Sequence, residues 1–382
     1  MRNRIHMVLL AGCLTYACPL AAQMNCTVVV NSPEDQLMLA VNGADNPQDQ
    51  VAALDKYVQA HADSTFMPCV NASYTAAYLK LNNFDKAIEY GEKDFTANTA
   101  DINVMLNLLR AYVGAGNASD AAFDIINKVP DEIKKESNPS RPAKMNDADW
   151  QKAQQDLAEQ TKNERAYGEY AFFQLLPRVT EPTKQIQFLD SFMTSYPDTP
   201  NVSQVNFQYF VAYKRANNAA KADEYGEKSI ASDPNNVATL NLVADDYATR
   251  QTNLDKATQY ATKVLQLAPA MKKPDGMTDA DFKTNQNNQL GLAHTTLGYI
   301  AFLKAGKTRK VAPAIQEFKT AVDLLGANPE LQGKALYFLG SAYEFEYPPN
   351  HKAAADALGR VAGPWQGQAQ GLLAKVKRAE HR

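Results

Sequence analysis

The sequence predicts an all-α fold in which antiparallel helix pairs stack into an α-α superhelix (a solenoid), and three observations support this. First, the pentapeptide EYGEK at positions 89–93 returns letter for letter at 224–228. Second, apolar residues recur at helical spacing from Asp49 onward, and no stretch shows a sustained period-two alternation. Third, the breaks between helical stretches are short and rich in Asn, Gly and Pro. Such self-similarity is typical of stacked repeats rather than of one core.

The first 22 residues have the pattern of a signal peptide. Arg2 and Arg4 precede an apolar stretch that ends at Leu20, and small residues at 21–22 suit cleavage. The apolar stretch is shorter than the ~20 residues that span a bilayer, so we expect a periplasmic or secreted protein without a transmembrane span. Residues 10–13 (LAGC) also resemble a lipobox, which leaves a lipid anchor at Cys13 as an alternative.

Residues 23–47 are polar and rich in Asn and Pro, and we expect a lead-in with weak structure. Cys13 and Cys18 lie in the signal segment, so Cys26 and Cys69 are the cysteines of the mature chain. In an oxidising compartment these two either pair in a disulfide or remain as separate thiols, and the sequence leaves both possibilities open.

Two copies of a large module follow, at residues 48–181 and 182–313. The long helix near the end of each copy has a duplicated start. Asn146 and Thr278 are the expected N-caps, and Asp149 and Asp281 are their partners one turn later. Capping accounts for these Asp-x-Asp pairs better than a metal or catalytic site does. A truncated third copy at 314–364 and a C-terminal capping helix at 365–382, with a polar outer face, complete the expected solenoid.

A finer period runs within the modules, as between Tyr213 and Tyr247. This pattern resembles the tetratricopeptide repeat (TPR), a helix–turn–helix unit with bulky residues on its first helix and Ala on its second. The unit that begins at Ser203 departs from the family at Phe210, where a small residue is usual. Its matching positions are Tyr209, Tyr213, Ala222 and Pro234. The unit from Phe188 to Tyr213 is similar to secreted repeat proteins of bacterial envelope assembly.

The resemblance implies a right-handed superhelix that binds protein or peptide partners in its concave groove. In similar proteins the ligand-facing residues lie mainly on the first helix of each pair. The corresponding positions here do not reproduce the Lys/Asn/Arg clamp that holds a peptide carboxylate in some family members. Carried over position by position, the groove residues are Asn103, Arg110, Phe207, Lys214, Arg215, Asn241, Asp245, Tyr299, Tyr337 and Glu344.

Composition and motifs argue against several other functions. The net charge of −3 lacks the basic footprint of nucleic-acid binding. The five His are scattered, and the chain has no His-x-x-x-His, Cys-x-x-Cys, Gly-x-Ser-x-Gly or Walker motif, so we expect no catalytic residues, no metal and no cofactor. The interpretation is therefore a non-catalytic scaffold or adaptor of the cell envelope. Because the chain has 18 Tyr, 15 Phe and 2 Trp, binding of an envelope polymer or carbohydrate is the alternative.

Overall fold

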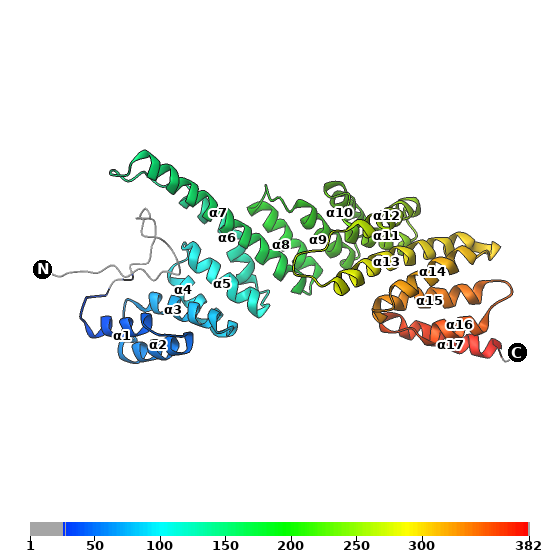
Figure 1. The fold of residues 1–382 in the computed structure, drawn as a ribbon, viewed down its shortest axis with the longest axis horizontal. Coiled ribbons are helices and arrows are strands. Elements are labelled where there is room, and N and C mark those ends of the chain that lie inside the picture. The colour runs from blue at the N-terminus through cyan, green and yellow to red at the C-terminus, as the bar shows by residue number, and fades with distance from the viewer. Residues whose placement is uncertain (1–25, 27, 381–382) are drawn as a thin grey trace. The chain divides into compact units, whose positions relative to one another are not determined.

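The computed structural model describes residue 26 and residues 28–380, and in this part of the chain the regular elements are α-helices and short 3-10 helices (Figure 1). The predicted all-α fold is thus confirmed. The expected signal peptide at 1–22, with Cys13 and Cys18, lies outside the described residues. The chain divides after Pro200 into two compact units, here called unit 1 and unit 2.

The described residues of unit 1 form eight α-helices and one 3-10 helix: α1 (Pro33–Asn42), α2 (Pro47–His61), α3 (Met67–Lys80), α4 (Phe84–Ala97), α5 (Ile102–Ala115), α6 (Asp120–Glu136), α7 (Asp147–Leu175), η1 (Leu176–Arg178) and α8 (Pro182–Ser195). Consecutive helices from α1 to α7 pack together, α8 packs on α6, and α5 also contacts both α3 and α7. The odd-numbered helices α3, α5 and α7 therefore form one layer of this unit.

Unit 2 follows the same plan, and as far as residue 380 it has nine α-helices and three 3-10 helices: α9 (Val202–Arg215), α10 (Ala219–Ser232), α11 (Val237–Arg250), α12 (Leu254–Leu267), η2 (Ala268–Ala270), α13 (Asp279–Ala305), η3 (Gly306–Thr308), α14 (Ala312–Leu324), α15 (Pro329–Phe345), α16 (His351–Gly359), η4 (Gly363–Trp365) and α17 (Gln366–Glu380). Here α13 contacts both α11 and α15. The last helix, α17, is the expected C-terminal helix.

The repeated pentapeptide makes the same contacts in both units. Tyr90 stacks on Tyr74 with ring centres 4.2 Å apart, and Tyr225 stacks on Tyr209 at 4.4 Å. Offset stacking at these distances adds about 0.5–1.5 kcal/mol to the burial of the rings. The stacked rings join the second helix of a pair to the first, which explains why Tyr recurs at all four positions.

Two further residues of the pentapeptide hold the following helix. The Tyr112 hydroxyl donates to Glu92 Oε1 at 2.6 Å, and the Tyr247 hydroxyl donates to Glu227 Oε1 at 2.7 Å. Next to Glu92, a Cβ on Gly91 would lie 3.0 Å from a Leu108 methyl carbon, so glycine permits close packing of α4 on α5. These matched contacts show that the two copies share one structural register, set by the alignment of the two pentapeptides.

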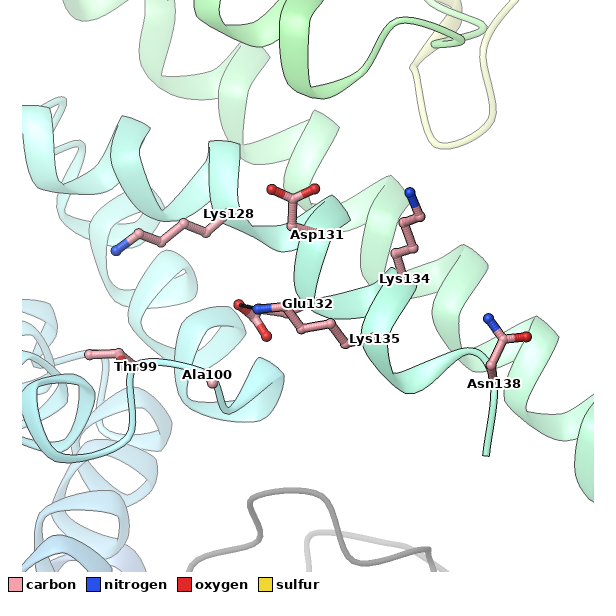
Figure 2. Close-up of a pocket in the computed structure, with 8 residues that line it drawn as sticks. All are labelled: Thr99, Ala100, Lys128, Asp131, Glu132, Lys134, Lys135 and Asn138. Atoms are coloured by element: carbon pink, nitrogen blue, oxygen red, sulfur yellow. Dashed lines mark hydrogen bonds and ion pairs between the residues drawn. The ribbon is translucent and has the colours of Figure 1, made fainter. Parts of the chain in front are cut away.

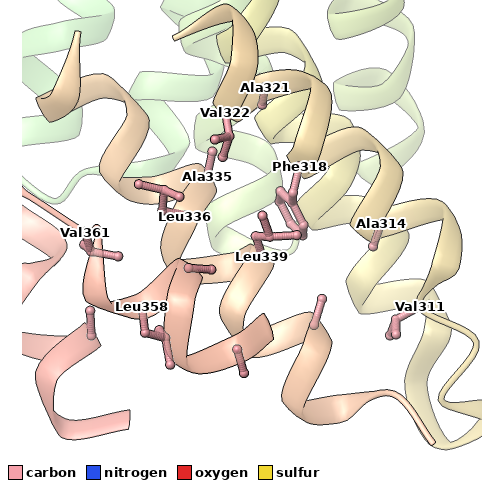
Figure 3. Packing of buried hydrophobic residues seen from close by; sticks show 14 of the residues in the cluster. Val311, Ala314, Phe318, Ala321, Val322, Ala335, Leu336, Leu339, Leu358 and Val361 are labelled. Atoms are coloured by element: carbon pink, nitrogen blue, oxygen red, sulfur yellow. The ribbon is translucent and has the colours of Figure 1, made fainter. Parts of the chain in front are cut away.

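A continuous apolar core joins α14, α15 and α16 in unit 2 (Figure 3). Phe318 of α14 packs between the helices, and Leu336, Leu339 and Leu358 close the space around it. Full burial of one such side chain stabilises the fold by about 1.5–3 kcal/mol. The core thus extends over more than one helix pair, as expected of a stacked repeat.

The two long helices begin where the sequence predicts. The Asn146 side-chain oxygen accepts from the Asp149 amide at 2.8 Å, and the Thr278 hydroxyl oxygen accepts from the Asp281 amide at 3.1 Å. In return, Asn146 and Thr278 donate to the side-chain carboxylates of these Asp residues, both at 2.7 Å. Asn146 and Thr278 are therefore the N-caps, and the second Asp of each duplicated pair is the capping partner.

The expectation of weak structure for residues 23–47 is wrong, because Pro33–Asn42 form helix α1. Ser32 caps this helix by accepting from the Asp35 amide at 3.0 Å, and Met38 and Val41 are fully buried. A disulfide joins Cys26 to Cys69 of α3, with the Cα atoms 5.8 Å apart. Residues 28–47 thus belong to unit 1 as folded structure, because two buried apolar residues and the disulfide at Cys26 fix an otherwise polar stretch.

The boundary between the compact units does not coincide with the boundary between the sequence copies. Helix α8 opens the second copy, yet it packs in unit 1, where Phe192 stacks on Phe172 of α7 at 4.0 Å. The Tyr196 hydroxyl then donates to the buried Ile126 carbonyl oxygen at 2.9 Å. A solenoid allows this difference, because each of its repeats packs against its neighbours in the chain.

Candidate functional site

Side chains from three other elements of unit 2 lie around Lys334, which is near the start of α15. Its Nζ forms a salt bridge with Asp245 and donates to Thr249 Oγ1 at 3.1 Å, both on α11. The same nitrogen lies 6.0 Å from the ring centres of Tyr299 on α13 and Trp365 in η4. These five residues are called the Lys334 cluster below.

Glycines position this cluster. Gly333 lies so close to the following loop that an added Cβ would stand 2.3 Å from the Ala362 carbonyl oxygen. Gly363 adopts a φ of +71°, a conformation that favours glycine, and so lets the chain turn back over α15. The close approach and the turn together bring Trp365 to Lys334.

Aromatic rings surround the ammonium group. Tyr299 lies 4.5 Å from Phe338, and Trp365 lies 5.2 Å from Tyr337, measured between ring centres. The Lys334 side chain is only 16% exposed, which strengthens its attraction to the rings and to Asp245. A cation over an aromatic face is worth about 0.5–1 kcal/mol in water and more when it is desolvated.

Three of the predicted groove residues, Asp245, Tyr299 and Tyr337, therefore lie in or directly beside the Lys334 cluster. Two other predicted residues are packed into the protein. Phe207 joins the core around Phe210, and Asn241 is only 4% exposed. The Asn241 amide donates to Gln289 Oε1 at 2.8 Å, and its Oδ1 atom is buried without a hydrogen-bond partner.

The remaining predicted residues of unit 2 are charged. Lys214 forms a salt bridge with the buried Asp246 at 3.1 Å, and Glu344 pairs with His351 Nδ1 at 2.7 Å. Arg215 is exposed in the last turn of α9. The charged side chains of Lys214 and Glu344 thus have partners outside the Lys334 cluster.

In unit 1 the predicted residues lie on α5. Asn103 and Arg110 are both exposed, and the Arg110 guanidinium carbon lies 5.3 Å from the ring centre of Tyr167 on α7. Burial raises the pKa of Tyr167 to about 12, although the nearby Arg110 lowers it. Tyr170, one turn further along, is 49% exposed. Unit 1 therefore has its own polar-aromatic surface between α5 and α7.

Unit 1 also contains an open pocket of about 660 Å³ between the turn before α5 and the outer side of α6 (Figure 2). Within it, Lys135 forms an ion pair with Glu132 at 2.7 Å. The sequence predicted none of its residues, and their charges are mixed. The lining residues are Thr99, Ala100, Lys128, Asp131, Glu132, Lys134, Lys135 and Asn138.

Neither a metal site nor a membrane-spanning helix is present in the described part of the chain. Among residues 26 and 28–380, no three or more His, Cys, Asp or Glu side chains are arranged to hold a metal ion. No helix within the same residues is both long and apolar enough to cross a membrane. His294 lies inside α13 and contacts Glu317 Oε2 at 2.6 Å.

No family model and no curated protein matches the chain. Solved structures do match it. One similar structure is the C-terminal part of a TPR repeat-containing protein from Cytophaga hutchinsonii, with 16% identity, 68% of this chain and 98% of that chain covered, and a TM-score of 0.32. Yeast Tom70 has 13% identity, 91% and 88% coverage, and a TM-score of 0.29. The TPR domain of P58(IPK) has 12% identity, 91% and 98% coverage, and a TM-score of 0.26.

Two of these three structures are described as TPR proteins. Their TM-scores are all below 0.5, so the repeat architecture of this chain rests on its own helix pairs and duplicated contacts.

Proposed function

We propose that this chain is a non-catalytic scaffold that binds an extended segment of a partner protein across α11, α13 and α15 of unit 2. The observation that carries the proposal is the Lys334 cluster, in which four elements contribute a cation, a carboxylate, a hydroxyl and two aromatic rings to one place. Solenoids typically use such extended surfaces for binding.

The chemistry of the surface suits a polypeptide. Leu242, Asp245 and Thr249 are spaced at i, i+3 and i+7 on α11, so they lie on one face of the helix. Leu242 is 41% exposed and provides an apolar contact beside the polar groups. Tyr337 and Trp365 belong to the residue types that contribute most to binding hot spots. A peptide would find hydrogen-bonding groups and apolar surface side by side.

We also propose that the protein works outside the cytoplasm, in the periplasm or after secretion. The signal-like pattern at residues 1–22 supports this location. The disulfide between Cys26 and Cys69 supports it as well, because disulfides persist mainly in oxidising compartments.

Site-specific photo-crosslinking in the native host tests the proposal. A photoreactive amino acid replaces Leu242 on α11, and the control places it at the exposed Thr262 on α12. We expect a discrete protein adduct from position 242 that is absent from position 262 and is lost when Lys334→Glu is added. The same adducts from both positions, or an adduct insensitive to Lys334, would contradict binding at this surface.

A polysaccharide is the second candidate ligand, favoured by the partly buried rings of Tyr337 and Trp365, which lie 5.2 Å apart beside charged hydrogen-bonding groups. Titration with soluble peptidoglycan fragments distinguishes the two candidates through Trp365 emission. Saturable quenching that Trp365→Phe abolishes, without a protein adduct in the crosslinking experiment, would transfer the proposal to a polymer ligand.

A further inference from the structure

Two turns meet at one end of the helices α13 to α16 in unit 2. The first turn, residues 306–311, joins α13 to α14, and the second, residues 346–350, joins α15 to α16. Arg309 connects them, because its Nε atom donates to the Phe345 carbonyl oxygen at 2.7 Å and its guanidinium carbon lies 5.6 Å from the ring centre of Tyr347. Residues 304–311 and 345–352 are called the tip below.

Contacts on both sides of the second turn fix its backbone. Before the turn, the Phe345 ring packs on Phe302 of α13 with the ring centres 5.6 Å apart. After the turn, the Asn350 amide donates to the Tyr343 carbonyl oxygen at 2.9 Å, and the Asn350 side chain caps α16. The residues between these anchors therefore project from the helices in a defined position.

Tyr347 is the most prominent of these projecting residues. It is 81% exposed, more than any other large apolar residue in the part of the chain that the structure describes. Pro348 is exposed as well, and neither Pro348 nor Pro349 has a backbone N–H group that would lose a hydrogen bond at an apolar surface. The tip therefore presents apolar surface to its surroundings and gives the core nothing in return.

The tip is also basic. Its sequence has five Lys or Arg residues and one acid, Glu346. The nearby Glu344 is already paired with His351 Nδ1 at 2.7 Å. Exposed lysines on other helices of unit 2 share a carboxylate, as Lys221 and Lys228 share Glu224.

The cations of the tip have no such partner. Lys304, Lys310 and Lys352 are exposed, and Arg309 is half-buried against the Phe345 ring at 5.2 Å. Among residues 26 and 28–380, none of these four side chains forms an ion pair. Their charge is thus available to an anionic surface outside the chain.

We infer that the tip is a contact site for an anionic lipid bilayer: the Tyr347 ring enters the headgroup region, and Lys304, Arg309 and Lys310 face the anionic headgroups. Tyrosine suits this region because its ring is apolar and its hydroxyl is polar. Each cation near an anionic bilayer strengthens binding roughly fivefold, so three of them together strengthen it on the order of 10²-fold. A soluble anionic polymer would need the charges but would leave the exposed ring and prolines unused.

Contact at the tip leaves the Lys334 cluster accessible. Lys334 and Phe345 lie about 16 Å apart along α15, at a rise of ~1.5 Å per residue. The tip shares no residue with the Lys334 cluster, so the inference does not depend on the proposed partner. A bilayer at one end of α15 and a partner near the other end can be bound together.

Co-sedimentation with vesicles tests the site, using the chain without residues 1–22 so that the signal-like segment contributes no binding. In roughly 0.1 M salt we expect binding to vesicles that contain phosphatidylglycerol, and on the order of 10²-fold weaker binding to phosphatidylcholine alone. In roughly 1 M salt the Debye length falls from about 10 Å to about 3 Å, and the preference for anionic vesicles is expected to disappear. Equal binding to both kinds of vesicle at the lower salt, or binding to neither, would overturn the inference.

Variants separate the tip from the charge of the whole chain. Lys304→Ser/Lys310→Ser is expected to weaken binding to the anionic vesicles on the order of 10-fold or more, and Tyr347→Ser is expected to weaken it as well. Lys272→Ser/Lys283→Ser removes the same charge from exposed lysines near the other end of α13 and is expected to bind like the wild type. Equal losses in the two double variants, each folded by circular dichroism, would show that the tip is not the contact.

A polarity-sensitive dye reports whether the tip itself meets the lipid. The dye is attached to Tyr347→Cys, and the control carries it on Thr262→Cys, an exposed position of α12. Cys26 and Cys69 are joined in the disulfide, so the introduced thiol is the one that reacts. Anionic vesicles are expected to shift the emission to the blue at position 347 only. Aqueous emission at position 347 in the vesicle-bound protein, or a blue shift with soluble polyglutamate but not with vesicles, would overturn the inference.

Discussion

Replacement of Gly333 by Ala tests the packing that builds the Lys334 cluster. An added Cβ would stand 2.3 Å from the Ala362 carbonyl oxygen, whereas such contacts are essentially never shorter than 3.0 Å. The blocking atom belongs to the backbone, so a rotamer change cannot relieve the overlap. The loop that leads into η4 must therefore move away from α15 and take Trp365 with it.

The expected cost follows from two opposing effects. Overpacking typically destabilises a protein by about 1–3 kcal/mol. Alanine favours a helix over glycine by about 1 kcal/mol, which offsets part of that cost. Because a backbone atom is displaced, we expect the upper end of the range and a net loss of about 2 kcal/mol in the free energy of unfolding of unit 2. Displacement of Trp365 also removes its contact with Lys334.

Urea unfolding followed by tryptophan emission measures both effects. The chain has two tryptophans, so Trp150→Phe leaves Trp365 as the reporter. Gly333→Ala is expected to lower the unfolding midpoint and to change the native emission of Trp365. Gly371→Ala is the matched control, because an added Cβ there meets nothing within 4 Å and the helix gains about 1 kcal/mol. Unchanged stability and emission in Gly333→Ala would refute the packing of η4 on α15.

Three further outcomes are expected in unit 1. Loss of the disulfide in a Cys26→Ser/Cys69→Ser variant is expected to cost about 4 kcal/mol, because the bond closes a loop with a sequence separation of 43; thermal unfolding against the oxidised protein measures it. Asp94→Asn is expected to stabilise unit 1 at pH 8 by up to about 4 kcal/mol and to have little effect at pH 4, because burial raises the pKa of Asp94 to about 7. Urea unfolding across this pH range measures it, and the same change of unfolding free energy with pH in the variant and the wild type would contradict it. Gly168→Ala is expected to cost about 1–2 kcal/mol by urea unfolding, because the new Cβ would lie 2.4 Å from the Tyr196 hydroxyl while alanine gains about 1 kcal/mol over glycine in the helix; wild-type stability would show that this ring can move.

The architecture was predictable because its determinants are local and repeated. The stacked tyrosines such as Tyr74 and Tyr90 recur at a fixed offset, and the caps Asn146 and Thr278 stand directly before their helices. Gly116, directly after α5, has a φ of +65°, the left-handed conformation that favours glycine at the end of a helix. Each of these features is visible within a short stretch of sequence. Helix α1 was missed because its place depends on tertiary burial of two residues.

The site was predictable only in part, because it depends on neighbours distant in the chain. The groove positions carried over from similar repeat proteins correctly included Asp245 and Tyr299, but they also included the buried Asn241. Lys334 has no local motif, and its partner Asp245 lies 89 residues away. Trp365 reaches the cluster only through the close approach of the backbone at Gly333. Such contacts require the relative positions of three helices, which the repeat pattern does not contain.

The structural register also shows where the two copies differ in charge. In the same alignment of the pentapeptides, Arg110 of α5 corresponds to Asp245 of α11. Each lies on an odd-numbered helix and reaches toward a neighbouring odd-numbered helix: Arg110 toward Tyr167, and Asp245 toward Lys334. The framework residues, such as the tyrosine–glutamate pair of each copy, are the same in both. Stacking therefore requires the shared residues, whereas the charge at this surface position is free to differ. A charge reversal at one matched position means that the two units present different chemistry on equivalent faces, so a ligand suited to one face is not expected to suit the other.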